Sequence, residues 1–225
     1  ILKYGFFVDT ASEPVGYVTL RRLERLHRYN EWIWSRLRPF VGQRVLEVGS
    51  GTGSMTRLLY GRDLIVATDK ETAYFDRLAN AFRRRPGMAV ERLDLDTDPP
   101  ARFSEYRFDT VTAINVLEHT KDDVAALRRI HGLLEPGGRV VIYVPANHSL
   151  YGTLDRGVGH ERRYERDEIA KKLEAAGFTV EETGFQNQAG KLGWWFNAKI
   201  LRRKSLPSAQ SRMFDFFVPL FRSLE

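Results

Sequence analysis

The strongest chemical signal in the sequence is a glycine-rich segment, Glu47-Val48-Gly49-Ser50-Gly51-Thr52-Gly53. Glycines allow a ligand to approach the backbone closely, and the free N–H groups of a helix that follows would bind a carboxylate or phosphate. A dinucleotide fingerprint, G-x-G-x-x-G, requires a third glycine at position 54, where this chain has Ser54. The Glu47 carboxylate would repel a pyrophosphate but attract an ammonium group, so the segment favours an ammonium-bearing ligand over NAD.

Polar side chains also follow three other apolar runs of the sequence. Asp69 ends a continuous apolar run that begins at Leu64, Asp94 follows a shorter run, and His119 comes soon after another. Such runs are typical of strands buried on both faces of a parallel sheet. Because ligands of these sheets bind beyond the carboxyl ends of the strands, we expect these side chains along one ligand-binding edge.

The elements that would position these residues alternate between strand and helix. Apolar periodicity and turn residues predict five strands at about 44–48, 64–68, 89–93, 108–114 and 139–144. They also predict helices at about 19–37, from the glycine segment to 60, and at 72–84, 120–134 and 167–176. This alternation predicts an α/β fold with a doubly wound, mostly parallel Rossmann-like sheet. A last strand is expected at 178–185.

Composition limits the remaining possibilities. The chain has 225 residues and a formal net charge of +6, which suits one large domain. It has no cysteine, so disulfides, catalytic thiols and thiolate metal sites are excluded. The arginines are dispersed along the chain, which disfavours nucleic-acid binding. No apolar run approaches the ~20 residues that cross a bilayer, so we expect a cytoplasmic protein, at most peripheral to a membrane.

With an acid two residues before its first glycine, the segment 47–53 resembles the first motif of the class I S-adenosylmethionine-dependent methyltransferases. Further motifs of that family follow in order from about Arg44 to Val144, including Leu134-Glu135-Pro136-Gly137-Gly138 before a strand. The resemblance implies S-adenosyl-L-methionine as cofactor and S-adenosyl-L-homocysteine as product. The family's last, antiparallel strand has no counterpart, because the sequence after Gln188 predicts helices; it is either absent or lies beyond residue 225.

The resemblance also assigns the cofactor site. Asp69 matches the acid that binds the ribose hydroxyls, and Asp94 matches the polar residue near the adenine amino group. The backbone at Asn115 would lie along the methionine part of the cofactor. The complete cofactor-binding set is Tyr29, Glu47, Gly49, Gly51, Gly53, Asp69, Lys70, Asp94, Leu95, Asn115 and Val116.

Two of these assignments leave alternatives open. Tyr29, in the leading helix, would either touch the cofactor carboxylate or pack the helix onto the sheet. Lys70 would either border the adenine or remain solvated.

Proton removal is the other chemistry that the sequence must supply. Methyl transfer from a sulfonium is an in-line displacement, and an acceptor hydroxyl or carbon acid must also lose its proton. His119 and His160 are the candidate catalytic bases, with a structural role as the alternative for His119. No metal site is expected.

The long segment 146–163 is predicted to be a loop over the ligand-binding edge. It resembles a loop found in a bacterial subgroup of these methyltransferases. We expect it to bind an anionic or oxygen-rich acceptor through His148, Tyr151, His160, Arg163 and Tyr164. In the alternative interpretation, Arg163 and Tyr164 tie this loop to the helix that follows.

We expect one domain with three parts. A helical lead over 1–40 covers the cofactor, and a core over 41–145 binds it. Residues 146–225 hold the acceptor loop, a helix, a strand and an aromatic helical segment. The aromatic segment would form core, a homodimer contact, or a surface for a lipid-linked acceptor or a membrane interface. A monomer is equally open.

The expected function is methyl transfer to an oxygen or carbon of a small-molecule or lipid- or sugar-linked acceptor. The segment Asn115-Val116-Leu117-Glu118 lacks the N/D-P-P-Y/F motif, which disfavours methylation of nucleobase nitrogens. An NAD-dependent oxidoreductase and a non-catalytic S-adenosylmethionine-binding protein are the alternatives.

Overall fold

A five-stranded parallel sheet forms the centre of the protein. The computed structural model describes residues 18, 22, 23 and 25–225. The strand order is β3-β2-β1-β4-β5, and every pair of neighbours is parallel. The strands are β1 (Arg44–Val48), β2 (Leu64–Asp69), β3 (Met88–Arg92), β4 (Phe108–Ile114) and β5 (Leu134–Tyr143). The predicted doubly wound α/β fold is confirmed.

Side chains of the strands alternate between two apolar layers, because successive residues of a strand point to opposite faces. Val45 and Ile65 face one layer, against which Trp34 packs. Leu46 and Val66 face the other, which includes side chains of α4 (Asp123–Leu133) and α6 (Arg166–Ala175). The sheet is therefore covered on both faces, and only its edges can expose polar groups to a ligand.

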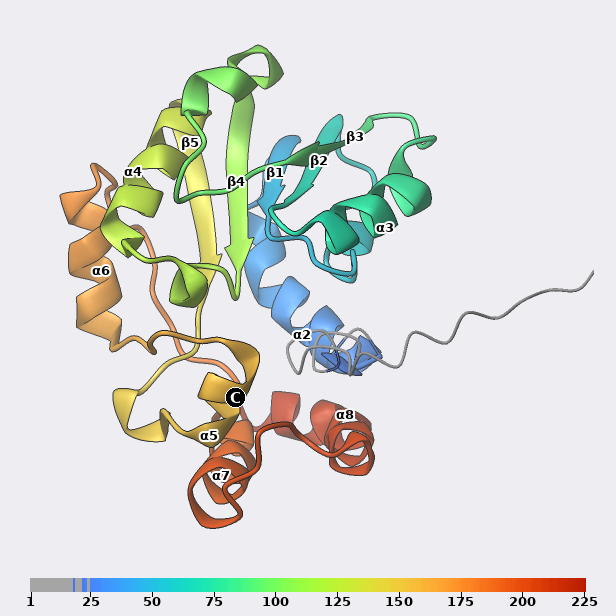
Figure 1. Cartoon of the computed structure of the whole chain (residues 1–225), viewed down its shortest axis with the longest axis vertical. Helices are drawn as coiled ribbons and strands as arrows, with labels where there is room; N and C mark the ends of the chain where they lie inside the picture. The colour runs from blue at the N-terminus through green and yellow to red at the C-terminus, as the bar shows by residue number, and fades with distance from the viewer. Residues whose placement is uncertain (1–17, 19–21, 24) are drawn as a thin grey trace, which may run out of the picture.

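The α-helices of the described residues are α2 (His27–Leu37), α3 (Thr72–Phe82), α4 (Asp123–Leu133), α5 (Thr153–Val158), α6 (Arg166–Ala175), α7 (Gln188–Trp195) and α8 (Ser208–Ser223). In Figure 1 the arrowheads of β4 and β5 point toward the half of the molecule that holds α5, α7 and α8. The carboxyl ends of the strands and the C-terminal part of the chain therefore face each other.

Three predicted elements differ in the structure. The glycine segment leads into a short 3₁₀ turn, Thr56–Leu59, instead of an α-helix, because this tighter turn buries Thr56 and Leu59 three residues apart. The predicted leading helix is interrupted: residues 18, 22 and 23 are helical, the buried Leu26 has a non-helical backbone, and α2 begins at His27. Residues 19–21 and 24 of that predicted helix lie outside the described residues. The segment 146–163 contains a 3₁₀ turn, His148–Leu150, and α5.

The prediction of a strand over 178–185 is wrong. The segment passes β5 without joining the sheet, and side chains alone connect it: Arg139 Nε lies 3.1 Å from Glu181 Oε2. Arg166 donates to Thr183 Oγ1 from the α6 side. Polar side chains thus hold this segment near the sheet, in place of the backbone hydrogen bonds that a strand would form. Between residues 144 and 225, the structure contains no strand.

The C-terminal helices cover α2. Asp215 Oδ1 of α8 accepts a hydrogen bond from the Tyr29 N–H (2.9 Å), and Arg28 donates to the Phe216 carbonyl (3.0 Å). Several large apolar side chains nevertheless remain exposed on α7, α8 and the turn between them: Leu192, Trp195, Phe196, Ile200, Leu201, Met213, Phe216, Phe217, Leu220 and Leu224. Among the described residues, none of the helices is long and apolar enough to span a bilayer. Peripheral membrane contact and dimerisation through this surface stay predictions.

Candidate active site

The glycine segment turns sharply between β1 and the 3₁₀ turn because Gly49, Gly51 and Gly53 all adopt positive φ angles. At Gly49, φ is +67°, and an added Cβ would lie 2.6 Å from Val116 Cγ2. At Gly53, φ is +78°, and an added Cβ would lie 2.5 Å from the Phe82 ring. Only glycine combines this backbone with such close neighbours. The turn therefore brings bare backbone to the carboxyl edge of the sheet.

Glu47 lies beneath this turn and is almost fully buried. Its Oε2 accepts hydrogen bonds from Ser50 Oγ (2.7 Å) and Thr56 Oγ1. Burial raises the pKa of Glu47, and the two hydroxyl donors oppose that rise. Glu47 thus holds the turn together, in addition to the attraction for a cationic ligand that its charge predicts.

Asp69, at the end of β2, is connected to the same turn. Its Oδ2 accepts a hydrogen bond from the Gly51 N–H (2.9 Å), and its Oδ1 accepts one from the Glu71 N–H (3.0 Å). Burial raises the pKa of Asp69, and the two backbone donors oppose the rise. Each carboxylate oxygen has a second lone pair, so these bonds leave capacity for ribose hydroxyls.

The other predicted cofactor residues differ in exposure. Asn115 has φ +54° and donates its N–H to the Tyr143 carbonyl (2.8 Å), which places the exposed Asn115 at the end of β4. Asp94 Oδ1 accepts the Asp96 N–H in a turn after β3. Leu95 is buried in the core, and Lys70 is exposed. The exposed position of Lys70 favours the solvated alternative.

Tyr29 lies against α8 and the end of β5. Its hydroxyl is 3.3 Å from the Tyr143 hydroxyl, and its ring packs edge-on against Trp32 and Phe214. Burial raises the pKa of Tyr29, which therefore stays neutral at physiological pH. These contacts favour the packing alternative for Tyr29.

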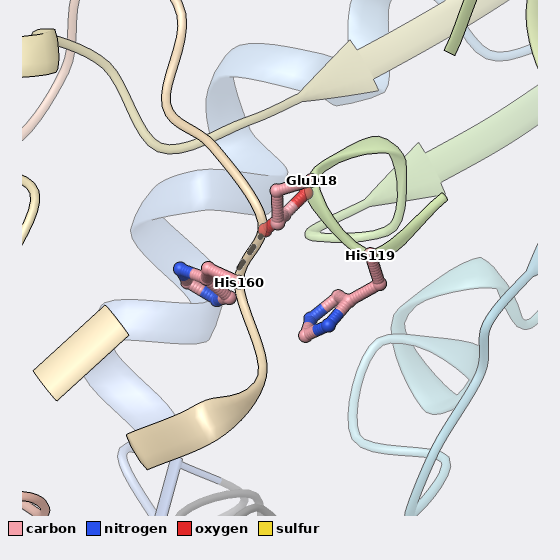
Figure 2. A group of neighbouring side chains, drawn as sticks. All are labelled: Glu118, His119 and His160. Atoms are coloured by element: carbon pink, nitrogen blue, oxygen red, sulfur yellow. Dashed lines mark ion pairs between the residues drawn. The ribbon is translucent and has the colours of Figure 1, made fainter. Parts of the chain in front are cut away.

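Glu118, His119 and His160 meet at the carboxyl end of β4, although His160 comes from the segment after α5 (Figure 2). His160 Nε2 lies 3.7 Å from Glu118 Oε1. The rings of His119 and His160 contact edge to face, with centroids 4.9 Å apart. The two candidate bases are therefore neighbours, and a buried carboxylate accompanies them.

The charge state of this cluster depends on burial. Burial raises the pKa of Glu118 to about 8, since a charged carboxylate loses its hydration there. Burial, together with the neighbouring His160, lowers the pKa of His119 to about 4. At neutral pH His119 is therefore a neutral imidazole with a free lone pair, and its low pKa makes it a weaker base than an ordinary histidine.

Asp155 connects the segment 146–163 to this cluster. No motif of the sequence indicated this role. Its carboxylate is fully buried and receives hydrogen bonds from Arg163 Nε (2.8 Å), the Gly152 N–H (2.9 Å) and Trp194 Nε1 (3.2 Å). His160 Nδ1 lies 3.1 Å from its Oδ1. Burial alone would raise the pKa of Asp155, but these partners lower it. Asp155 is therefore an anion that orients His160.

Arg163 and Tyr164 are buried inside the segment. Arg163 also donates to the Ala146 carbonyl (2.9 Å), and its guanidinium stacks on the Trp194 ring. Tyr164 is 1% exposed and donates its hydroxyl to Asp123 Oδ2 (3.2 Å). These contacts disfavour acceptor binding by either residue. Tyr164 also lies under Lys172 of α6, so it joins the segment to the helix that follows as well as to α4, whereas Arg163 is tied to Asp155 and Trp194 instead.

The last two predicted acceptor residues lie apart. His148 Nε2 is 2.8 Å from Glu168 Oε2 on α6, so its ring is engaged away from the cluster. Tyr151 donates its hydroxyl to the His160 carbonyl (2.9 Å) and supports the backbone there. Of the five predicted acceptor residues, the structure brings His160 alone into the cluster, with Tyr151 behind it.

A parallel sheet with a glycine-rich turn after β1 and an acid at the end of β2 defines a Rossmann-like α/β protein that binds a nucleoside cofactor at its carboxyl edge. Residues 20–183 match the family model described as a methyltransferase domain. The chain belongs to this family of class I S-adenosylmethionine-dependent methyltransferases, and S-adenosyl-L-methionine is its cofactor. The NAD-dependent alternative is therefore set aside.

Two fungal relatives and two solved structures illustrate the similarity. The chain is 34% identical over 106 residues to fusarielin synthase FSL1 of Gibberella zeae, covering 44% of this chain and 4% of the relative. It is 29% identical over 162 residues to lovastatin nonaketide synthase mokA of Monascus pilosus, covering 68% of this chain and 5% of the relative. The chain thus spans a small part of these relatives' length.

Among solved structures, the trans-methyltransferase CalH, in a complex with SAH, has a TM-score of 0.52 and 25% identity, covering 69% of this chain and 52% of CalH. The CMeT domain of the citrinin polyketide synthase has a TM-score of 0.54 and 19% identity, covering 66% of this chain and 44% of that one. The second likeness supports the fold. The expected bacterial subgroup stays a prediction.

Proposed function

We propose that the chain transfers the methyl group of S-adenosylmethionine to an oxygen or carbon of a small-molecule acceptor that must lose a proton. The observation that carries this proposal is the cluster of Glu118, His119 and His160 at the carboxyl edge of β4. A neutral amine acceptor would need no such cluster, whereas a hydroxyl or carbon acid would. The polyketide synthases among the relatives support a small-molecule acceptor of this kind.

The residues of the chain divide the work between two parts of the carboxyl edge of the sheet. The glycine turn and Asp69 bind and orient the cofactor, which supplies the electrophilic methyl group when bound. His119, with its free lone pair, accepts the proton from the acceptor, and Asp155 keeps His160 oriented beside it. Holding donor and acceptor in line, with water excluded, supplies the remaining rate enhancement.

Two measurements test this proposal. Calorimetric titration with S-adenosylhomocysteine should show binding that Asp69→Ala weakens at least about tenfold, because the ribose then loses a charged acceptor. Incubation with S-adenosylmethionine and separate panels of phenols, β-ketoacyl thioesters and lipid- or sugar-linked alcohols should give a product one methylene heavier. Amine acceptors serve as the control panel.

The outcomes separate the remaining alternatives. Binding of S-adenosylhomocysteine without any methylated product would favour the non-catalytic alternative. Methylation confined to the amine panel would contradict the need for proton removal. A product whose rate is unchanged by His119→Ala at every pH would remove His119 as the base.

A further inference from the structure

The cluster of Glu118, His119 and His160 also has the composition of a metal site. One ligand atom from each of the three side chains lies within 4.8 Å of the other two. Two residues come from the turn after β4, and the third comes from the segment after α5, so the chain closes around the cluster (Figure 2). Our expectation of no metal site came from the lack of cysteine, but two imidazoles and a carboxylate bind metals without thiolates.

Glu118 is the most unusual member of the cluster. Its side chain is 0% exposed, and neither carboxylate oxygen has a hydrogen-bond partner within the part of the chain that the structure describes. An unpaired buried carboxylate is costly, and buried charges are normally paired or coordinate metals. His160 Nε2 lies 3.7 Å from Glu118 Oε1, beyond hydrogen-bonding distance, so a cation would give this carboxylate a closer partner.

The two histidines are already oriented as metal ligands usually are. His119 Nδ1 lies 3.0 Å from the Gly159 carbonyl, and His160 Nδ1 lies 3.1 Å from Asp155 Oδ1. Both oxygens can only accept, so each Nδ1 carries the proton and each Nε2 keeps its lone pair. Histidines that bind metals commonly donate their other N–H to a carbonyl or carboxylate in this way.

We propose that Glu118, His119 and His160 together bind one divalent transition-metal ion, such as Zn²⁺ or Mn²⁺. Imidazole ligands select these ions over Mg²⁺ and Ca²⁺, which prefer oxygen ligands alone. Ligand atoms lie about 2.0–2.2 Å from such ions, so the three groups must close by about 1 Å. Three protein ligands would leave positions open for solvent or substrate.

The proposed ion also has a role that rests on the proposed function. Bound to an acceptor oxygen, the ion would lower the pKa of the hydroxyl or enol; in the metal-loaded chain the His119 lone pair is a ligand, so solvent takes the proton in place of His119. The acceptor would then carry an oxygen at, or next to, the atom that is methylated. Metal binding itself does not depend on methyl transfer and can be measured without an acceptor.

Equilibrium dialysis of the chelator-treated chain against Zn²⁺ or Mn²⁺, with elemental analysis of the protein, tests the site. We expect one ion per chain, and at least about tenfold weaker binding in Glu118→Gln and His160→Ala. His131→Ala is the matched control, because His131 packs on the Phe178 ring outside the cluster. Circular dichroism and S-adenosylhomocysteine titration of each variant show whether the fold and the cofactor site remain intact.

A second measurement needs no variant. Pulsed electron paramagnetic resonance of the Mn²⁺-loaded chain should detect coupling to imidazole nitrogens. The proposal is overturned if no stoichiometric ion binds, if no imidazole coupling appears, or if Glu118→Gln binds as tightly as His131→Ala. If the chain binds S-adenosylhomocysteine but no metal ion, the metal site is refuted and the proposed function is not. If the chain binds a metal ion but no S-adenosylhomocysteine, the proposed function is refuted and the metal site is not.

Discussion

Along the carboxyl edge of the sheet, the cofactor end around the glycine turn and the proposed acceptor end around His119 and His160 are built in different ways. At the cofactor end, Glu47 and Ser50 are three residues apart in sequence, and Gly51 and Asp69 are 18 apart. At the acceptor end, His119 contacts Gly159 across 40 residues, and Asp155 contacts Trp194 across 39. The first end is held mainly by a local turn, and the second by a network of buried charges.

This difference affects stability as well as recognition. A turn of glycines is sensitive to added volume, whereas a buried ion pair is sensitive to loss of either partner, which leaves an uncompensated charge. Substitutions at the two ends should therefore destabilise the protein for different reasons. Variants of decreasing severity at the two ends test that contrast.

Asp155→Ala should have the largest effect on stability. It removes the partner of the buried Arg163 and the acceptor of the Gly152 and Trp194 donors. Breaking a buried pair costs about 3–5 kcal/mol, so the urea midpoint should fall strongly. Glu181→Ala is the control, because its pair with Arg139 is exposed on both sides and is worth about 0–1 kcal/mol. Equal losses in the two variants would contradict the buried network.

Gly53→Ala should destabilise the cofactor end by about 1–3 kcal/mol. The new methyl group would overlap the Phe82 ring, and φ at Gly53 is +78°. Gly61→Ala is a matched control, since its φ is +91° but nothing lies within 4 Å of an added Cβ. We expect Gly53→Ala to weaken S-adenosylhomocysteine binding and Gly61→Ala to leave it unchanged. If both variants bind equally well, volume at the turn does not shape the cofactor site.

Asp123 predicts a pH dependence of the free energy of unfolding. Its carboxylate forms the tie between Tyr164 and α4. Burial opposes ionisation, but Lys172 (2.6 Å) and the Tyr164 hydroxyl outweigh it and lower the pKa of Asp123 below its ordinary value of 3.8. The resulting stability is present above pH 3.8 and is lost as pH falls through the lower folded-state value.

Asp123→Asn should therefore cost about 1 kcal/mol at neutral pH and less at pH about 3. Urea unfolding of both proteins at the two pH values measures the difference. A cost that is the same at both values would show that ionisation of Asp123 does not stabilise the tie.

The sequence predicted the locally built cofactor end better than the acceptor end, which depends on contacts between distant segments. The strand Phe108–Ile114 matches its predicted range, and Asp69 lies at the glycine turn as expected, because apolar runs and turn glycines act locally. The tie of Arg163 to Asp155 and the burial of Glu118 without a hydrogen-bond partner depend on the packing of distant segments. No local pattern encodes such packing. For the same reason the missing strand at 178–185 could not be foreseen, since pairing depends on the neighbouring edge.

Tyr29→Phe should have the smallest effect and decides between the two interpretations of Tyr29. The hydroxyl makes a long contact of 3.3 Å to the Tyr143 hydroxyl, while the ring contacts to Trp32 and Phe214 survive the substitution. We therefore expect a stability loss of about 0.5–1 kcal/mol and unchanged S-adenosylhomocysteine affinity. Tyr143→Phe removes the same hydroxyl contact but leaves the 3.5 Å hydrogen bond from Asn187 Nδ2 to the Tyr29 hydroxyl, so it should also leave the affinity unchanged and cost no more stability than Tyr29→Phe. A tenfold loss of affinity in Tyr29→Phe alone would instead place its hydroxyl on the cofactor, and would extend the cofactor end beyond its local turn to α2.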